Sequence, residues 1–234
     1  MTDGFFRDII EAAISLYFIS CKKRRKTMPE FVITIARGFG SGGRTIGRML
    51  AERLDINYYD GELIRLASEE SGINVELFGK ADEHVKTSLF KRYNRSYGYK
   101  LIPPDSSEFA SDDNLFNYQA KIIRSLAEKQ DCVIIGRCSD YILKDHPNAI
   151  RLLIYADRQS CIRNVTELYG IHPREANNRI EELDRGRASY YKYYTGKEWD
   201  APENYDLCIN TTKYGFEKTV DIILAYMRTL GYNV

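Results

Sequence analysis

Short apolar runs rich in β-branched residues alternate along this chain with longer segments of helical periodicity. The predicted strands are residues 31–36, 57–60, 132–136, 150–155 and 207–210. Consecutive apolar positions of this kind are typical of strands buried on both faces of a parallel sheet. Helical spacing of apolar residues predicts helices over 44–54, 158–169, 173–188 and 216–230. The alternation predicts a three-layer α/β fold around a five-stranded parallel sheet.

Residues 61–130 interrupt this alternation. Their pattern is mostly helical, with a break at the adjacent Pro103 and Pro104. The segment is too long for an ordinary crossover between two parallel strands, so we expect it to project as a subdomain. Residues 190–205 are rich in aromatic side chains and are expected to form a loop.

Composition excludes several classes of protein. The chain has 234 residues, 44% of them hydrophobic, and a formal net charge of +1. It is therefore not a disordered chain, and nothing in the overall charge predicts nucleic acid or a membrane surface as a partner. The five cysteines contain no C-x-x-C pair, which favours a reducing cytoplasm, and Cys132 and Cys208 are expected in the core.

Residues 1–29 form an extension of uncertain role ahead of a domain over residues 30–234. An amphipathic pattern from Phe5 to Tyr17 precedes a basic run at residues 22–26. The apolar stretch is too short and too charged for stable insertion into a bilayer. A helix on a membrane surface, a docking helix, and an upstream extension of a domain starting at Met28 remain open, and the last two are preferred.

The sharpest motif lies between the first predicted strand and the first predicted helix. Its residues are Gly38, Phe39, Gly40, Ser41, Gly42, Gly43, Arg44 and Thr45. They match the phosphate-binding pattern G-x-x-x-x-G-K-[ST] at every fixed position except Arg44, which replaces lysine. Glycines let phosphate oxygens approach the backbone N–H groups, and the following helix adds the positive end of its dipole. We therefore expect this loop to bind the phosphates of ATP, with the Thr45 hydroxyl on Mg²⁺.

Arg44 permits two interpretations. One is a decayed loop that binds nucleotide without transferring phosphate. The other is a working replacement, because arginine is always charged and can bind two phosphate oxygens at once. The second interpretation is preferred, and Arg44 is a candidate catalytic residue.

The ordered set of motifs resembles the cytidylate kinase-like family of P-loop proteins. The motifs are G-S-G-G-R in the loop, Tyr58-Tyr59-Asp60 with Glu62-Leu63-Ile64, Ile135-Gly136-Arg137-Cys138, Asp184-Arg185-Gly186-Arg187-Ala188, and Trp199 with Asn204-Tyr205-Asp206-Leu207. The resemblance covers residues 30–234. It implies a P-loop NTPase fold with a helical acceptor-binding insert at about 61–130 and a lid at about 170–200. It also implies phosphoryl transfer from ATP with Mg²⁺ to a small acceptor, a nucleoside monophosphate.

The resemblance also suggests acceptor-binding residues. Arg137 corresponds to the arginine of a G-R-D motif that holds the acceptor in cytidylate kinases, but Cys138 replaces the aspartate. Asp60, at the carboxyl end of the second strand, can bind the acceptor or cap the next helix. Arg65, one turn on, can face the acceptor phosphate or solvent. Asp140 and Asp157 are unranked candidates for anchoring magnesium in place of the missing aspartate.

The lid residues are expected to bring positive charge to the transferring phosphoryl group. The candidates are Arg185 and Arg187 as catalytic residues, with Arg163, Arg179 and Asp184 as further lid candidates. An ordinary charged helix face is the alternative. The aromatic residues after Ala188 are expected to pack the lid hinge against the core, with stacking on a base as the alternative. A nucleotide sensor without activity and a kinase for a non-nucleotide acceptor remain as rival functions.

Overall fold

The computed structural model describes residues 31–78 and 97–234. The predicted N-terminal extension and part of the predicted insert lie outside the described residues. The strands are β1 (Val32–Arg37), β2 (Asn57–Tyr59), β3 (Cys132–Ile135), β4 (Ala149–Tyr155) and β5 (Leu207–Asn210). The helices are α2 (Gly43–Leu54), α3 (Glu62–Ser71), α5 (Asp112–Lys129), α6 (Ser139–Ile142), α7 (Arg158–Tyr169), α8 (Pro173–Thr195) and α9 (Thr211–Thr229), with a 3₁₀ turn at Pro202–Asn204.

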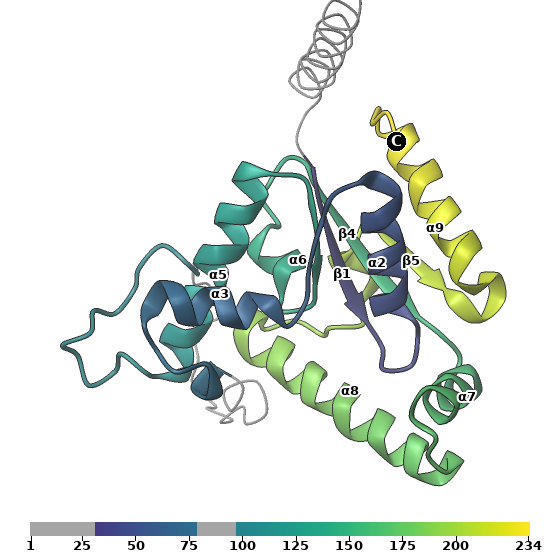
Figure 1. Cartoon of the computed structure of the whole chain (residues 1–234), viewed down its shortest axis with the longest axis horizontal. Coiled ribbons are helices and arrows are strands. Elements are labelled where there is room, and N and C mark those ends of the chain that lie inside the picture. The colour runs from purple at the N-terminus through teal and green to yellow at the C-terminus, as the bar shows by residue number, and fades with distance from the viewer. Residues whose placement is uncertain (1–30, 79–96) are drawn as a thin grey trace, which may run out of the picture.

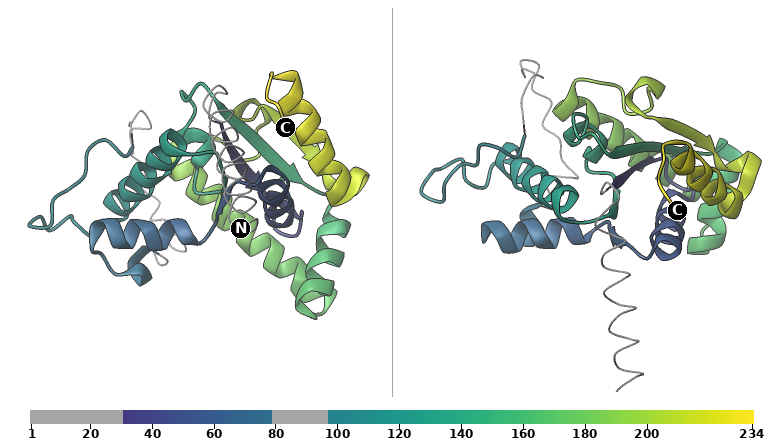
Figure 2. Two further views of the ribbon diagram at one scale, coloured as in Figure 1. Left: turned by 45° about the horizontal axis from the view of Figure 1, so that its top comes forward. Right: turned by 90° about the horizontal axis from the view of Figure 1, so that it is seen from above.

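The five strands form one parallel sheet in the order β2-β3-β1-β4-β5, which confirms the predicted fold class. Alternate side chains of β1 face opposite sides, so Ile33 and Ile35 pack under α2 and α9 while Val32 packs toward α5. Figures 1 and 2 show α2 and α9 side by side on the first face of the sheet. Because all strands run the same way, their carboxyl ends meet at one edge, where α8 passes (Figure 1).

Helices α3 and α5 lie together beyond the β2 side of the sheet in every view (Figures 1 and 2). They share a small apolar cluster built on Ala67, Phe78 and Leu115. Helices α7 and α8 share another, built on Val165 and Ile180. The limits of the predicted insert and lid stay predictions. No helix in the two described stretches is long and apolar enough to cross a membrane.

The structure corrects the expectation that residues 190–205 form a loop from their start. Helix α8 continues to Thr195 and ends at Gly196, which has a φ of 74°. Tyr191 and Tyr194 are buried, and the Tyr194 ring stacks on Phe116 of α5 with 3.8 Å between the ring centroids. These rings lie at helical spacing on the side of α8 that faces the core, so packing against α5 extends the helix. The preferred role of packing is therefore confirmed for these two residues.

Candidate active site

The glycine-rich loop joins β1 to α2 as predicted, at the carboxyl edge of the sheet. Gly40 and Gly42 have φ values of 82° and 85°, a left-handed conformation that favours glycine. The Gly38 N–H donates to the carbonyl of Ile154 on β4 over 3.2 Å, which fixes the start of the loop to the sheet. Helix α2 begins at Gly43, so its N-terminal end faces the space enclosed by the loop.

Three polar side chains hold the carbonyl groups of this loop. Ser41 Oγ donates to the Gly38 carbonyl over 2.8 Å, and Asn164 Nδ2 of α7 donates to the Gly40 carbonyl over 2.7 Å. Thr211 Oγ1 donates to the Ser41 carbonyl over 2.8 Å. With its carbonyls engaged this way, the loop can turn its N–H groups toward an anion. Asn164 and Thr211 belong to no sequence motif, so no pattern in the sequence indicates their role.

Gly40 should not tolerate a side chain. A Cβ atom there would lie 2.7 Å from the Cys161 carbonyl oxygen and 3.0 Å from its Cα, and φ is +82°. We expect Gly40→Ala to lower the free energy of unfolding by about 2 kcal/mol, because backbone of α7 must move and the left-handed conformation is strained.

Urea denaturation measures this change, with Gly186→Ala as the control. A Cβ atom on Gly186 meets nothing within 4 Å, and alanine favours the helix. That variant should be as stable as the parent or slightly more so. Equal stability of the two variants would contradict the packing of the loop against α7.

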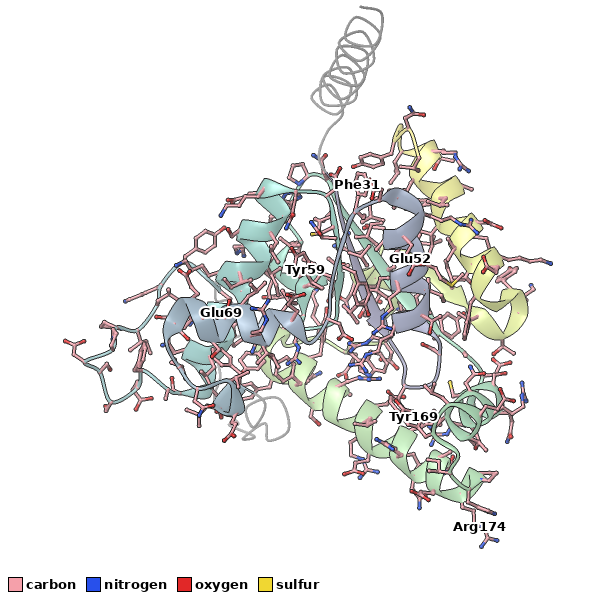
Figure 3. All side chains as sticks on the ribbon, in the orientation of Figure 1. Phe31, Glu52, Tyr59, Glu69, Tyr169 and Arg174 are labelled. Atoms are coloured by element: carbon pink, nitrogen blue, oxygen red, sulfur yellow. The ribbon has the colours of Figure 1, made fainter. Side chains whose placement is uncertain are left out.

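Two cavities open at the carboxyl edge of the sheet. The smaller, of about 370 Å³, is lined by the phosphate loop, by Asn164 and Tyr169 of α7, and by Phe216 of α9. The larger, of about 640 Å³, extends past Asp60 and Arg137 to the rings of Trp199 and Tyr205. Figure 3 shows nitrogen-bearing side chains gathered between the ends of the strands and α8.

Three residues line both cavities, and all three are arginines: Arg37, Arg44 and Arg187. Arg44 Nε lies 2.8 Å from Asp60 Oδ2, and Arg37 Nη2 lies 3.9 Å from Asp60 Oδ1. The Asp60 carboxylate therefore faces these arginines, whereas the N-cap residue of α3 is Gly61. Two roles are predicted for Asp60, acceptor binding and the N-cap of the next helix. The structure places Asp60 in the lining of the larger cavity, and the N-cap alternative is wrong.

The turn after β3 has an unusual backbone. Gly136, Arg137 and Cys138 have φ values of 68°, 61° and 53°, so two residues other than glycine adopt the left-handed conformation. Such strain is commonly found at functional sites. Arg137 lines the larger cavity as predicted. Cys138 is buried, and burial raises the pKa of its thiol, so this residue does not supply the charge of the aspartate that it replaces.

Asp140 and Asp157, the two candidate replacements for that aspartate, lie in different places. Asp140 is buried in the wall of the larger cavity, and its Oδ2 accepts a hydrogen bond of 2.6 Å from the Tyr191 hydroxyl. Burial raises the pKa of Asp140 to about 6. Asp157 lines neither cavity, and its Oδ1 accepts a hydrogen bond of 3.1 Å from Asn210 Nδ2.

Arg187 and Asp184 connect α8 to the phosphate loop. Arg187 Nη1 donates to Asp184 Oδ1 over 2.9 Å and to the Arg37 carbonyl over 3.2 Å. The Phe39 N–H donates to Asp184 Oδ1 over 2.8 Å. The Arg187 guanidinium also lies over the Phe39 ring, 5.6 Å from its centroid. Burial lowers the pKa of Arg187 and raises the pKa of Asp184.

The other arginines proposed from the sequence lie outside both cavities. Arg65 forms 2.5 Å ion pairs with Glu62 and Glu69 on α3 and is exposed, which corrects its placement toward the acceptor. Arg163 donates to Ser160 on its own helix. Arg179 lies over Tyr169 of α7, a residue labelled in Figure 3, at 4.7 Å from the ring centroid. Arg185 is exposed on α8, so a catalytic role for it stays a prediction.

The residues around the loop fit a magnesium ion bound through nucleotide phosphates. Among the described residues there is no group of three or more His, Cys, Asp or Glu side chains that could hold a metal alone. Thr45 lies in the first turn of α2 and lines the smaller cavity. Magnesium keeps several water ligands and commonly takes few ligands from protein, so one hydroxyl beside a phosphate site suffices.

Known proteins share this organisation. Residues 32–213 match the cytidylate kinase-like family. Cytidylate kinases from Methanopyrus kandleri and Pyrococcus horikoshii are 27% and 26% identical, over 83% and 84% of this chain and 91% and 88% of their own lengths. The crystal structure of an uncharacterized protein from Eubacterium ventriosum is 27% identical, with a TM-score of 0.62 over 85% of this chain and 99% of that chain. The chain therefore belongs to the cytidylate kinase-like family and is a P-loop kinase.

Proposed function

We propose that the protein transfers the γ-phosphoryl group of ATP to a small acceptor, a nucleoside monophosphate. The observation that carries this proposal is that the smaller and the larger cavity share three lining residues, Arg37, Arg44 and Arg187. A transferred phosphoryl group carries negative charge on its equatorial oxygens, and catalysis consists mainly of neutralising that charge and aligning the reactants. The shared arginines supply positive charge where a group must pass between the two cavities.

The smaller cavity is the proposed site for ATP. The N–H groups of the loop and the Arg44 guanidinium would hold the phosphates, and the Thr45 hydroxyl would hold Mg²⁺. When bound, Mg²⁺ would neutralise part of the negative charge of the phosphates. Asn164 and Thr211 keep the loop in the conformation that binding requires.

The larger cavity is the proposed acceptor site. Arg137 would hold the acceptor phosphate, and Tyr190, Trp199 and Tyr205 offer rings to a base. An acceptor phosphate oxygen would attack the γ-phosphorus of ATP, forming a new P–O bond. The bond from that phosphorus to the β–γ bridging oxygen would break, and ADP would leave with the electron pair. A phosphate acceptor is already ionised at neutral pH, so no general base is assigned.

An ADP-release assay with CMP, dCMP, UMP and AMP tests this function. We expect turnover with at least one of the four nucleotides. Flat traces with all four would contradict the proposal. Cys138 favours a rival, because its neutral thiol stands where cytidylate kinases have a carboxylate. Binding of ATP by calorimetry without turnover would support a sensor, and turnover only with small non-nucleotide alcohols would support a different acceptor.

A further inference from the structure

Arg37 belongs to none of the sequence motifs, yet its charged side chain is largely buried in the site. It is the last residue of β1 and lines both cavities. Ile35 of β1 pairs with Ile135 of β3, so Arg37 lies two residues beyond this pair, beside the turn after β3 that carries Arg137. Its side chain is only 15% exposed, which is low for arginine.

Two glycines make room for the Arg37 side chain. A Cβ atom on Gly136 would lie 2.0 Å from Arg37 Nη1, and one on Gly43 would lie 2.5 Å from Arg37 Cβ. Real Cβ atoms do not approach other atoms this closely, so a side chain at either position would displace Arg37. One of these glycines belongs to the phosphate loop and the other to the turn after β3. The guanidinium thus lies between the two loops that form the walls of the site.

The charge of Arg37 is poorly compensated within the described residues. Its Nε atom is buried and has no hydrogen-bond partner there. The carboxylate nearest to it, Asp60, lies at 3.9 Å and is already bound to Arg44 at 2.8 Å. Burial lowers the pKa of Arg37 to about 9, and repulsion by Arg187 adds to this effect, although the group stays protonated at neutral pH. A buried cation without a full set of partners favours binding an anion.

We propose that Arg37 is a phosphate-binding catalytic residue whose guanidinium holds the transferring γ-phosphoryl group between the two cavities. This inference rests on the proposed function. Planar guanidinium N–H groups can donate to two phosphoryl oxygens at once, and no proton is transferred. Arg37 is fixed in the sheet, in contrast to Arg187 on α8. It would therefore bind the γ-phosphate of ATP whether or not an acceptor is present.

Calorimetry with the full-length protein, Mg²⁺ and two nucleotides tests this role without turnover. We expect Arg37→Met to weaken binding of adenylyl imidodiphosphate about tenfold and binding of ADP less than twofold, because only the first carries a γ-phosphate. The melting temperature of the nucleotide-free variant should not fall, since a poorly compensated charge has been removed. Arg174→Met, at the far end of α8 (Figure 3), is the control and should bind both nucleotides as the parent does.

Equal weakening of binding for both nucleotides would show a structural role and overturn the inference. Unchanged binding of both nucleotides would also overturn it. If Arg37→Met does not fold, Arg37→Lys and Gly136→Ala replace it. Lysine should retain part of the γ-phosphate preference, and alanine should displace the guanidinium and lose it.

Turnover by the parent protein separates this inference from the proposed function. If the parent phosphorylates a nucleoside monophosphate and Arg37→Met keeps its preference for the γ-phosphate, only the inference fails. If the parent shows no turnover with any acceptor while Arg37→Met loses that preference, only the proposed function fails.

Discussion

Replacing Arg187 with methionine should lower kcat about 10³-fold while changing the affinity for ATP only slightly. Of the arginines of α8, Arg187 alone lines both cavities. An arginine that reaches the transferring group stabilises charge that develops in the transition state more than it stabilises bound substrate. Methionine keeps most of the side-chain volume, so the Phe39 contact is partly preserved while the charge is lost.

The measurement is steady-state kinetics of ADP release, with ATP binding followed separately by calorimetry. Arg174→Met is the matched control, because Arg174 lies on the same helix but at its far end (Figure 3). Arg185→Met compares the two arginines of α8 that the sequence proposes as catalytic, and the exposed position of Arg185 predicts a much smaller loss of kcat. A loss in Arg187→Met below about tenfold would contradict a role in the transition state.

The sheet and its phosphate loop could be predicted because their signals are local. The apolar run Cys132–Ile135 leaves no polar face to expose, and a parallel sheet buries both faces of a strand. The positive φ values of Gly40 and Gly42 already favour glycine, whatever else packs against the loop. Predictions from the sequence are wrong where tertiary packing decides how far an element extends. The last turns of α8 are an example, because the Tyr194 ring stacked on Phe116 stabilises them.

Sequence patterns predict where the site lies better than they predict which arginines line it. Arg65 lies in the expected segment, but the helix turns it toward Glu62 and Glu69 instead of the cavity. Arg37 was missed because nothing in its neighbourhood distinguishes it from a strand-end residue. Its place in the site is set by the register of β1 with β3 and by two glycines more than 90 residues apart, Gly43 and Gly136. Contacts of that kind have no local signature.

Asp140 should make the protein less stable at neutral pH than it would be with an uncharged residue. The residue is 3% exposed, and burial raises the pKa of its carboxyl group from 3.8 to about 6. The groups that favour its ionised form are the Tyr191 hydroxyl, the nearby Arg151 and the backbone N–H groups of Asp140 and Tyr141, and they do not offset the loss of solvation. A residue that lowers the stability of the fold while lining a ligand cavity is typically retained for function.

The sign of the pH dependence follows from this raised pKa. Between pH 3.8 and about 6 the folded state keeps a proton that the unfolded state has released. The contribution of Asp140 to stability is therefore full below that range and is lost as the pH rises through it. A shift of about two pH units corresponds to about 3 kcal/mol at pH 7.5.

We therefore expect Asp140→Asn to raise the free energy of unfolding by about 3 kcal/mol at pH 7.5, and most of that gain should disappear by pH 4.5. Asparagine keeps an oxygen that can accept the Tyr191 hydrogen bond, so the comparison isolates the charge. Urea denaturation of both proteins at the two pH values measures the difference, and Asp157→Asn, at a position that lines neither cavity, provides the control. A gain of the same size at both pH values would show that packing, and not ionisation, separates the two proteins. A loss at pH 7.5 would show that the ionised carboxylate stabilises the fold.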